Sequence, residues 1–190
     1  MLAVPFLIYM TVLDFDEIND LTDASVHLSG SVDELIDKVE TILILAYQAG
    51  FDAVEEMLEC DLAYDTEQMQ RAIFDPIEGK TFADRVADHV RNEDQDALRR
   101  LVENEAHRVS NIAGYDCAAA YGKTGGRVEK GWVTMGDDRV RDTHDYIDGR
   151  WVGLRDEFWT YDGDHAQYPG GFAYPENNIG CRCWLVYRRA

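Results

Sequence analysis

The stretch that decides the fold is QDALRRLVENEAHRVSNIAGYDCAAAYGKTGGRVEKGWVTM, residues 95–135, because the spacing of its apolar residues changes within it. From Gln95 to Tyr121 apolar residues recur every three or four positions, which predicts one long amphipathic helix. Past the glycine-containing residues 122–126 the spacing becomes two, starting at Arg127, which predicts a strand. The chain therefore changes from helix to sheet here, with Gly122 as the expected helix stop.

One face of this long helix is mostly apolar, but it carries a carboxylate, Glu105, near its middle. Glu105 lies on that face, and an unpaired buried charge is costly. Two interpretations remain: Glu105 lies at the edge of the stripe in water, or it is buried and paired. The other members of the face are Leu98, Leu101, Val102, Val109, Ile112, Ala113, Asp116 and Cys117.

Three helices are expected before the long one, each with a start signal. Ser31 and Glu34 form a capping box ahead of an apolar stripe. Asp65 starts a second box, and that helix should end before Pro76. Thr81 caps the third helix, whose apolar positions are Phe82, Val86 and Val90.

The last third of the chain is expected to hold short strands and one short helix. Asp138 is the expected cap of that helix, although Asp148-Gly149 also fits a hairpin turn. Residues 150–154 form a short strand and residues 161–180 a long loop, rich in Gly, Pro and Asn. Residues 181–187 form the final strand.

Charge also divides the chain in two. Its 190 residues carry 18 basic and 37 acidic side chains, a formal net charge of −19. Residues 1–126 have 9 basic and 26 acidic side chains, and residues 127–190 have 9 and 11. Such an acidic surface repels nucleic acid, so no strong nucleic-acid binding is expected. We predict an α+β fold: a mostly helical region over residues 1–122, then a small antiparallel β-sheet domain with one short helix over residues 127–190.

The N-terminal residues and the cysteine count bear on the compartment. Met1 to Leu13 is apolar, but it lacks a basic n-region and a cleavage site, and it is shorter than the ~20 residues that span a bilayer. We expect a core strand or docking segment there and no membrane role. Four cysteines in a chain of this length do not make a disulfide scaffold, so synthesis in a reducing cytoplasm is expected.

Cys181-Arg182-Cys183 is the candidate metal site. Alternate side chains of a strand share a face, so both sulfurs should point the same way. His144 on the short helix, or His165 in the loop, would join two thiolates in a structural zinc site. The alternative is that the cysteines pack as small apolar residues with His144 hydrogen-bonded nearby.

The segment Asp138–His144 also invites a catalytic interpretation, with His144 as the base for either cysteine. No glycine-rich phosphate loop, nucleophile elbow or paired-histidine zinc helix accompanies it in the sequence. Its charges also fit a solvated helix, in which Arg141 pairs with Asp138 and Asp145. We therefore expect no enzyme activity and no catalytic residue.

A series of short motifs runs in order from about Leu101 to Tyr187. It consists of Asn104-Glu105-Ala106-His107-Arg108, Asn111, Lys130-Gly131-Trp132-Val133-Thr134, Asp138-Arg139-Val140-Arg141-Asp142-Thr143-His144, Gly149, Phe158, Pro169, Pro175, Asn177-Asn178 and Cys181-Arg182-Cys183. In this order the motifs resemble the phage Mu protein F-like minor head proteins, a phage head morphogenesis family. The chain differs from that family in being short and acidic, and in having two residues between Asn178 and Cys181.

The resemblance implies a minor capsid protein of a tailed phage or prophage, a structural component of the head near the portal. It also implies the portal protein and the major capsid protein as partners, with assembly in the host cytoplasm and a final place in the virion head. The alternative is an enzyme or a toxin-associated domain with a Cys/His metal site, because this domain type is also found joined to toxin domains. No residue follows Ala190 here, so no appended effector is expected.

The motifs also supply expected structural or interaction residues. For Glu105 they suggest Arg139 or Arg141 as a buried partner, which would lock the long helix onto the sheet. Arg108, one turn along the same helix, is the competing partner and would make the pair local and weak. The expected structural or interaction residues are Glu105, Arg108, Lys130, Trp132, Asp138, Arg139, Arg141, Asn178 and Arg182. Structural zinc is the one cofactor considered, with Cys181, Cys183 and His144 as its ligands.

Overall fold

The structure is a computed structural model that describes Asp20 and residues 30–190. The expected docking role of the segment that begins at Met1 lies outside the described residues. The elements, in chain order, are α2 (Val32–Met57), α3 (Thr66–Phe74), α4 (Phe82–Arg91), α5 (Gln95–Lys123), β1 (Val128–Val133), α6 (Asp142–Asp145), β2 (Trp151–Gly153), β3 (Phe158–Trp159), β4 (His165–Ala166), α7 (Pro175–Asn178) and β5 (Trp184–Arg189). The predicted α+β fold is confirmed. Within the described ranges, no helix has the length and apolar character needed to cross a membrane.

The helix starts follow the capping signals in the sequence. The Ser31 hydroxyl accepts a hydrogen bond from the Glu34 N–H at 3.1 Å, and the Glu34 carboxylate accepts one from the Gly30 N–H at 2.8 Å. The Glu34 carboxylate thus accepts its hydrogen bond from the residue before the N-cap, whereas a standard capping box uses the N–H of the N-cap residue itself. Thr81 forms a complete reciprocal box at the start of α4, and Asp65 caps α3. Side chains therefore satisfy backbone N–H groups that have no partner inside the helices.

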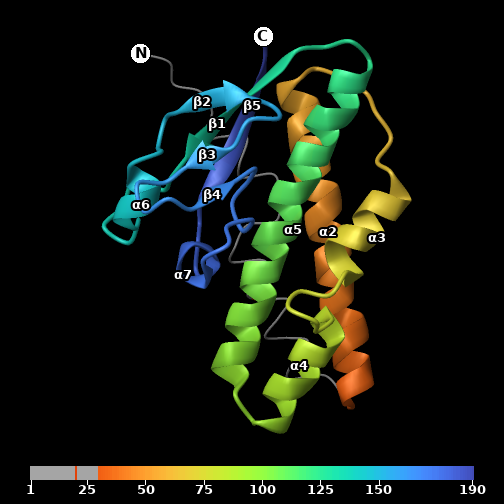
Figure 1. Cartoon of the computed structure of the whole chain (residues 1–190). Helices are drawn as coiled ribbons and strands as arrows, with labels where there is room; N and C mark the ends of the chain where they lie inside the picture. Colours follow the sequence, from red (N-terminus) through yellow and green to blue (C-terminus); the bar gives the residue numbers. More distant parts are fainter. Residues whose placement is uncertain (1–19, 21–29) are drawn as a thin grey trace.

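Two glycines let α2 and α5 pack closely along their length (Figure 1). A Cβ atom on Gly50 would lie 2.2 Å from the Ser110 carbonyl oxygen, and a Cβ on Gly114 would lie 2.9 Å from Val54 Cγ2. Real Cβ atoms do not approach other atoms so closely, so the backbones can meet only where a side chain is missing. This contact sets the distance between the two long helices.

The three-stranded sheet is antiparallel, in the order β2-β1-β5, and β3 and β4 form a separate hairpin. Val128, Lys130 and Trp132 on β1 are buried on one face, as their alternation predicted, and Val133 is exposed. β5 packs against both α2 and α5. At its end the Arg189 guanidinium donates to backbone carbonyl oxygens at the end of α2. The last strand thus ties the sheet to the helices.

Three boundaries in the second half differ from the predictions. The short helix begins at Asp142 instead of being capped by Asp138, so the predicted cap is wrong. The final strand begins at Trp184, so the two cysteines precede it instead of lying on it. The long helix continues through Gly122 to Lys123, and the left-handed glycine is Gly125, with φ of 97°. These ends lie two or three residues from the predicted ones, because apolar spacing marks the body of an element and not its last residue.

Glu105 is buried and paired, but not with either arginine of the C-terminal motif. Its Oε1 lies 2.9 Å from Arg85 Nη1 on α4, and its Oε2 lies 2.8 Å from Arg108 Nη2 on its own helix. Arg108 also donates to the Ala72 carbonyl oxygen at 2.7 Å. The predicted lock with Arg139 or Arg141 is wrong, because this face of α5 meets α3 and α4 instead of the sheet.

The Glu105 carboxylate remains charged for a physical reason. Burial would raise the pKa of Glu105, but the hydrogen bonds and charges of Arg85 and Arg108 outweigh burial and lower that pKa. Arg108, the alternative partner considered for Glu105, does pair with it. Arg85 also pairs with Glu105 and comes from α4, so the interaction joins two helices. The group holds α3, α4 and α5 together.

Gly50→Ala is expected to lower the free energy of unfolding by about 1–3 kcal/mol, because the new methyl group must push α2 away from α5. Gly122→Ala is the matched control, since its Cβ would meet nothing nearer than 3.8 Å and a helical alanine is up to about 1 kcal/mol better than glycine. Urea unfolding of both variants measures the difference. Equal effects of the two changes would contradict the close contact.

Glu105→Gln is expected to lower the free energy of unfolding by roughly 3–5 kcal/mol, because it leaves two largely buried guanidinium groups without a counter-charge. A double-mutant cycle with Arg85→Met should show strong coupling. Arg71→Met is the control: its partner Glu67 is exposed, so less than about 1 kcal/mol should be lost. Additive, sub-kilocalorie losses in the cycle would show that Arg85 does not hold Glu105.

Candidate functional site

His144, Cys181 and Cys183 meet in one buried cluster. His144 Nδ1 lies 3.3 Å from Cys183 Sγ and 3.6 Å from Cys181 Sγ, and the Cys183 N–H points at Cys181 Sγ at 3.5 Å. The three ligand atoms all lie within 4.8 Å of one another. The exposed fraction of each residue is 5% or less. The structure therefore brings together the three residues that the sequence proposed for a metal site.

Aromatic rings hold the His144 ring in place. Phe172 stacks on it with ring centroids 5.2 Å apart, and Trp132 meets it edge-on at 5.4 Å. His144 Nε2 is buried and has no hydrogen-bond partner among the residues described. The imidazole therefore makes polar contacts only through Nδ1, the atom that faces the two sulfurs.

His107 on α5 contacts the backbone of the cluster. Its Nε2 lies 2.7 Å from the Cys183 carbonyl oxygen, and because a carbonyl only accepts, this nitrogen carries the proton. Burial lowers the pKa of His107, so the ring is neutral at pH 7. The motif series contained this histidine but gave it no role. The other histidine considered as a ligand, His165, instead pairs with Glu157 at 3.0 Å in an exposed position.

The two thiols share one negative charge. A hydrogen bond from the Cys183 thiol and, less strongly, one with His144 lower the pKa of Cys181 to about 4, although burial opposes this. The same hydrogen bond and burial raise the pKa of Cys183. The hydrogen bond between the two cysteines thus stabilises one thiolate within the pair. The cluster favours negative charge, as a cation site requires.

Arg141 holds the loop that delivers the cysteines. Its guanidinium donates to the Asn177 carbonyl oxygen at 3.1 Å and to the Ile179 carbonyl oxygen at 2.6 Å. Thr143 Oγ1 donates to the Asn177 side-chain oxygen at 3.0 Å. The pairs of Arg141 with aspartates, expected for a solvated helix, are thus replaced by contacts to backbone. Helix α6 therefore positions both His144 and the chain before the cysteines.

Asn178 and Asn104 complete this support. The Asn178 side chain accepts from the Phe172 N–H at 3.0 Å and donates to the Phe172 carbonyl oxygen at 2.7 Å. Asn104 Oδ1 on α5 accepts from the Gly180 N–H at 2.9 Å. Gly180 has φ of 67°, and Ile179 points outward with 62% of its surface exposed. The two extra residues before the first cysteine thus form an outward turn, and the cysteines still reach His144.

Asp164 organises the same loop and was missed by the sequence reasoning. Its buried carboxylate accepts from the backbone N–H groups of His165, Ala173 and Tyr174 and from Asn177 Nδ2, at 2.9 to 3.1 Å. Burial would raise the pKa of Asp164, but these hydrogen bonds lower it. An aspartate among glycines and prolines resembles an ordinary turn residue, so sequence alone offers no signal for this role.

Lys130 is fully buried on β1. Its Nζ donates to the Gln167 carbonyl oxygen at 2.8 Å and to Gln167 Oε1 at 2.7 Å, above the rings of Tyr115 and Phe158. Burial lowers the pKa of Lys130 to about 7. Lys130 thus joins the sheet, α5 and the segment after β4. Trp132, two residues on, forms the aromatic wall beside His144.

Three further residues of the motif series, Asp138, Arg139 and Arg182, lie at or near the surface. Asp138 and Arg139 are exposed, and Arg182 pairs with Asp137 at 2.6 Å. A cavity of about 10 Å³ lies between this surface and the cluster, and His144, Cys181 and Cys183 are part of its lining. Its lining includes Met135, Arg139, Val140, Arg141, Gly180 and Arg182.

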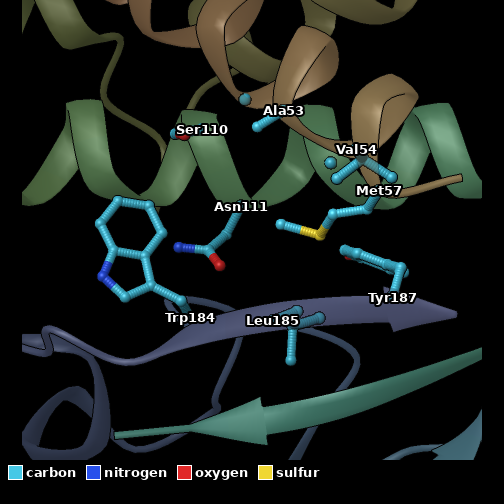
Figure 2. Close-up of a pocket in the computed structure, with 10 residues that line it drawn as sticks. Ala53, Val54, Met57, Ser110, Asn111, Trp184, Leu185 and Tyr187 are labelled. Carbon is cyan, nitrogen blue, oxygen red and sulfur yellow. The ribbon is translucent and has the colours of Figure 1, made fainter. Parts of the chain in front are cut away.

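A second cavity, of about 30 Å³, lies where β5 faces α2 and α5 (Figure 2). Figure 2 shows Asn111, Met57 and Trp184 around it, and Trp184 also meets the His107 ring edge-on at 4.6 Å. This cavity and the smaller one are too small for an organic substrate. A wider hollow, of about 550 Å³, lies between the start of α2 and the turn from α4 to α5, at a part of the fold without motif residues.

A family model described as phage Mu protein F like protein matches residues 66–186 of the chain. The chain belongs to this family. The matched range includes α3, α5, the Cys/His cluster and the first half of β5. The resemblance drawn from the ordered motifs is thereby confirmed.

Two curated relatives share part of the chain. One is an NAD(+)–arginine ADP-ribosyltransferase (EFV) of Enterococcus faecalis, 30% identical over 115 residues, which are 57% of this chain and 23% of that protein. The other is the minor head protein GP7 of Bacillus phage SPP1, 28% identical over 89 residues, which are 47% of this chain and 29% of that protein. This chain therefore spans less than a third of each relative. No solved structure matches it significantly.

Asp164→Asn is expected to lower the free energy of unfolding by about 1–3 kcal/mol at pH 7, because backbone donors lose their carboxylate. The folded-state pKa of Asp164 is lowered, so its contribution is present above the unfolded pKa of about 3.9 and is lost as the pH falls below that value. The stability difference from wild type should therefore shrink below about pH 4. Asp145→Asn, at an exposed position of α6, is the control and should change little. An identical effect of both substitutions would refute the role of Asp164.

Proposed function

We propose that this protein is a minor structural protein of a tailed-phage or prophage head, acting in head morphogenesis near the portal. Membership of the phage Mu protein F-like family is the observation that carries the proposal. Similarity to a phage minor head protein supports it. Under this proposal the protein is built in the host cytoplasm and ends in the virion head.

The use of the motif residues favours a structural role. Asn104, Arg141 and Asn178 all bind backbone groups of the loop before the cysteines. The cysteines and His144 are buried, and the cavity that they line has space for about one water molecule. An enzyme needs its reacting groups within reach of a substrate. Here the same residues hold one segment of the fold in place.

The partners proposed are the portal protein and the major capsid protein. Large apolar side chains are exposed on the C-terminal part of the chain, as at surfaces that meet other proteins. They are Val133, Met135, Tyr146, Trp151, Trp159, Tyr161, Tyr174 and Ile179. Most of the formal negative charge lies in the helical part, so the two parts present different surfaces.

The similarity to an ADP-ribosyltransferase supports a second candidate function, that of a domain associated with a toxin enzyme. The shared segment is 23% of that protein, so the similarity does not assign its activity to this chain. An assay of NAD+ consumption with an arginine-containing acceptor separates the two candidates. Consumption that depends on this chain would favour the second.

The test of the head function is the composition of purified heads. Gradient-purified heads from an induced lysogen should contain the protein, and chemical crosslinking should join it to the portal. Trp159→Ala with Tyr161→Ala should lower its incorporation several-fold without changing stability, since both side chains are more than half exposed. Phe74→Ala, exposed on α3, is the control and should incorporate normally. Heads that lack the wild-type protein would refute the proposal.

A further inference from the structure

We infer that Cys181, Cys183 and His144 bind one zinc ion. The inference rests on the geometry of these three side chains and does not depend on the proposed head function. The ion would join the short helix α6 to the segment that enters β5, two elements far apart in the sequence.

The spacing of the ligand atoms fits zinc. Zinc–sulfur bonds of about 2.3 Å and zinc–nitrogen bonds of about 2.0 Å, at tetrahedral angles, place a sulfur and a nitrogen about 3.5 Å apart. The two separations from His144 Nδ1 to the sulfurs are 3.3 and 3.6 Å. Both nitrogen–sulfur separations are therefore already those of neighbouring ligands around one tetrahedral ion, and all three atoms lie within 4.8 Å of one another.

The positions of the ligands are fixed before any ion binds. The His144 ring is held between Phe172 and Trp132 with Nδ1 turned toward the sulfurs. His107 donates to the Cys183 carbonyl oxygen, and the Cys181 N–H donates to the Asn178 carbonyl oxygen at 3.1 Å. Such outer contacts are what orient the ligands of a metal site.

The chemistry of the ligands also favours zinc. Thiolates are soft ligands and a neutral imidazole is a borderline one, and zinc binds both kinds well. Magnesium and calcium instead prefer oxygen ligands. Zinc with two thiolates is neutral, so the complete site can be buried without a further counter-charge.

The fourth coordination position faces the cavity of about 10 Å³. This space holds about one water molecule, the ligand that completes a zinc site with three protein ligands. His107 does not take the position, because its Nε2 already binds the Cys183 carbonyl oxygen. The expected shell is therefore two sulfurs, one imidazole nitrogen and one oxygen.

The experiment measures metal in the untagged full chain, purified with reductant and without chelator. Wild type should hold about one zinc ion per chain by elemental analysis. Cys60→Ser, which removes a thiol outside the cluster, should keep it, and Cys181→Ser and His144→Asn should lose it. Folded wild type without zinc, which also takes up no added Zn²⁺ or Co²⁺, would overturn the inference.

Loss of a metal ligand can prevent folding. A second test therefore uses the wild-type protein alone. X-ray absorption of the zinc-loaded protein should show two sulfur and two nitrogen or oxygen neighbours. Chelation of zinc should lower the melting temperature by several degrees and expose both thiols to alkylation. A shell without sulfur, or chelation that leaves melting and alkylation unchanged, would place the metal elsewhere and refute the site.

Discussion

The structure depends on satisfying the backbone of the long segment from β3 to β5, which has little regular structure of its own. Backbone N–H and C=O groups that leave water must find partners. Here the partners are side chains: the Asp164 carboxylate gathers three N–H groups, Arg141 binds two carbonyl oxygens, and Asn178 pairs with both polar groups of Phe172. Only with this segment fixed do two cysteines reach the interior beside His144.

In the helical part, the helices pack closely around one buried carboxylate. Gly50 and Gly114 allow α2 and α5 to approach, so that β5 can pack against both. Glu105 lies on the neighbouring face of α5, where Arg85 and Arg108 neutralise it and hold the shorter helices. The sheet and the short helices thus use different faces of one long helix, which explains why α5 occupies the centre of the fold (Figure 1).

Much of the fold followed from local patterns. The change of apolar spacing near Gly122 separates helix from strand, and Ser31, Asp65 and Thr81 mark helix starts that the structure confirms. The C-x-C spacing with His144 also pointed to one cluster. Strand ends were less certain, because the cysteines are followed by apolar residues that fit a strand in any register, and only pairing with β1 shows that β5 begins at Trp184.

The sequence by itself determined the α+β class, the main helices, the family and the identity of the clustered cysteines. Periodicity decides which residues share a face, and motif order survives changes in chain geometry. Only the tertiary structure decided which partners meet that face. Glu105 was expected to meet Arg139 or Arg141 and instead meets Arg85, because the direction in which α4 returns along α5 is not encoded in the spacing of either helix. Asp164 and His107 gained their roles in the same way, from backbone groups that no local pattern brings near them.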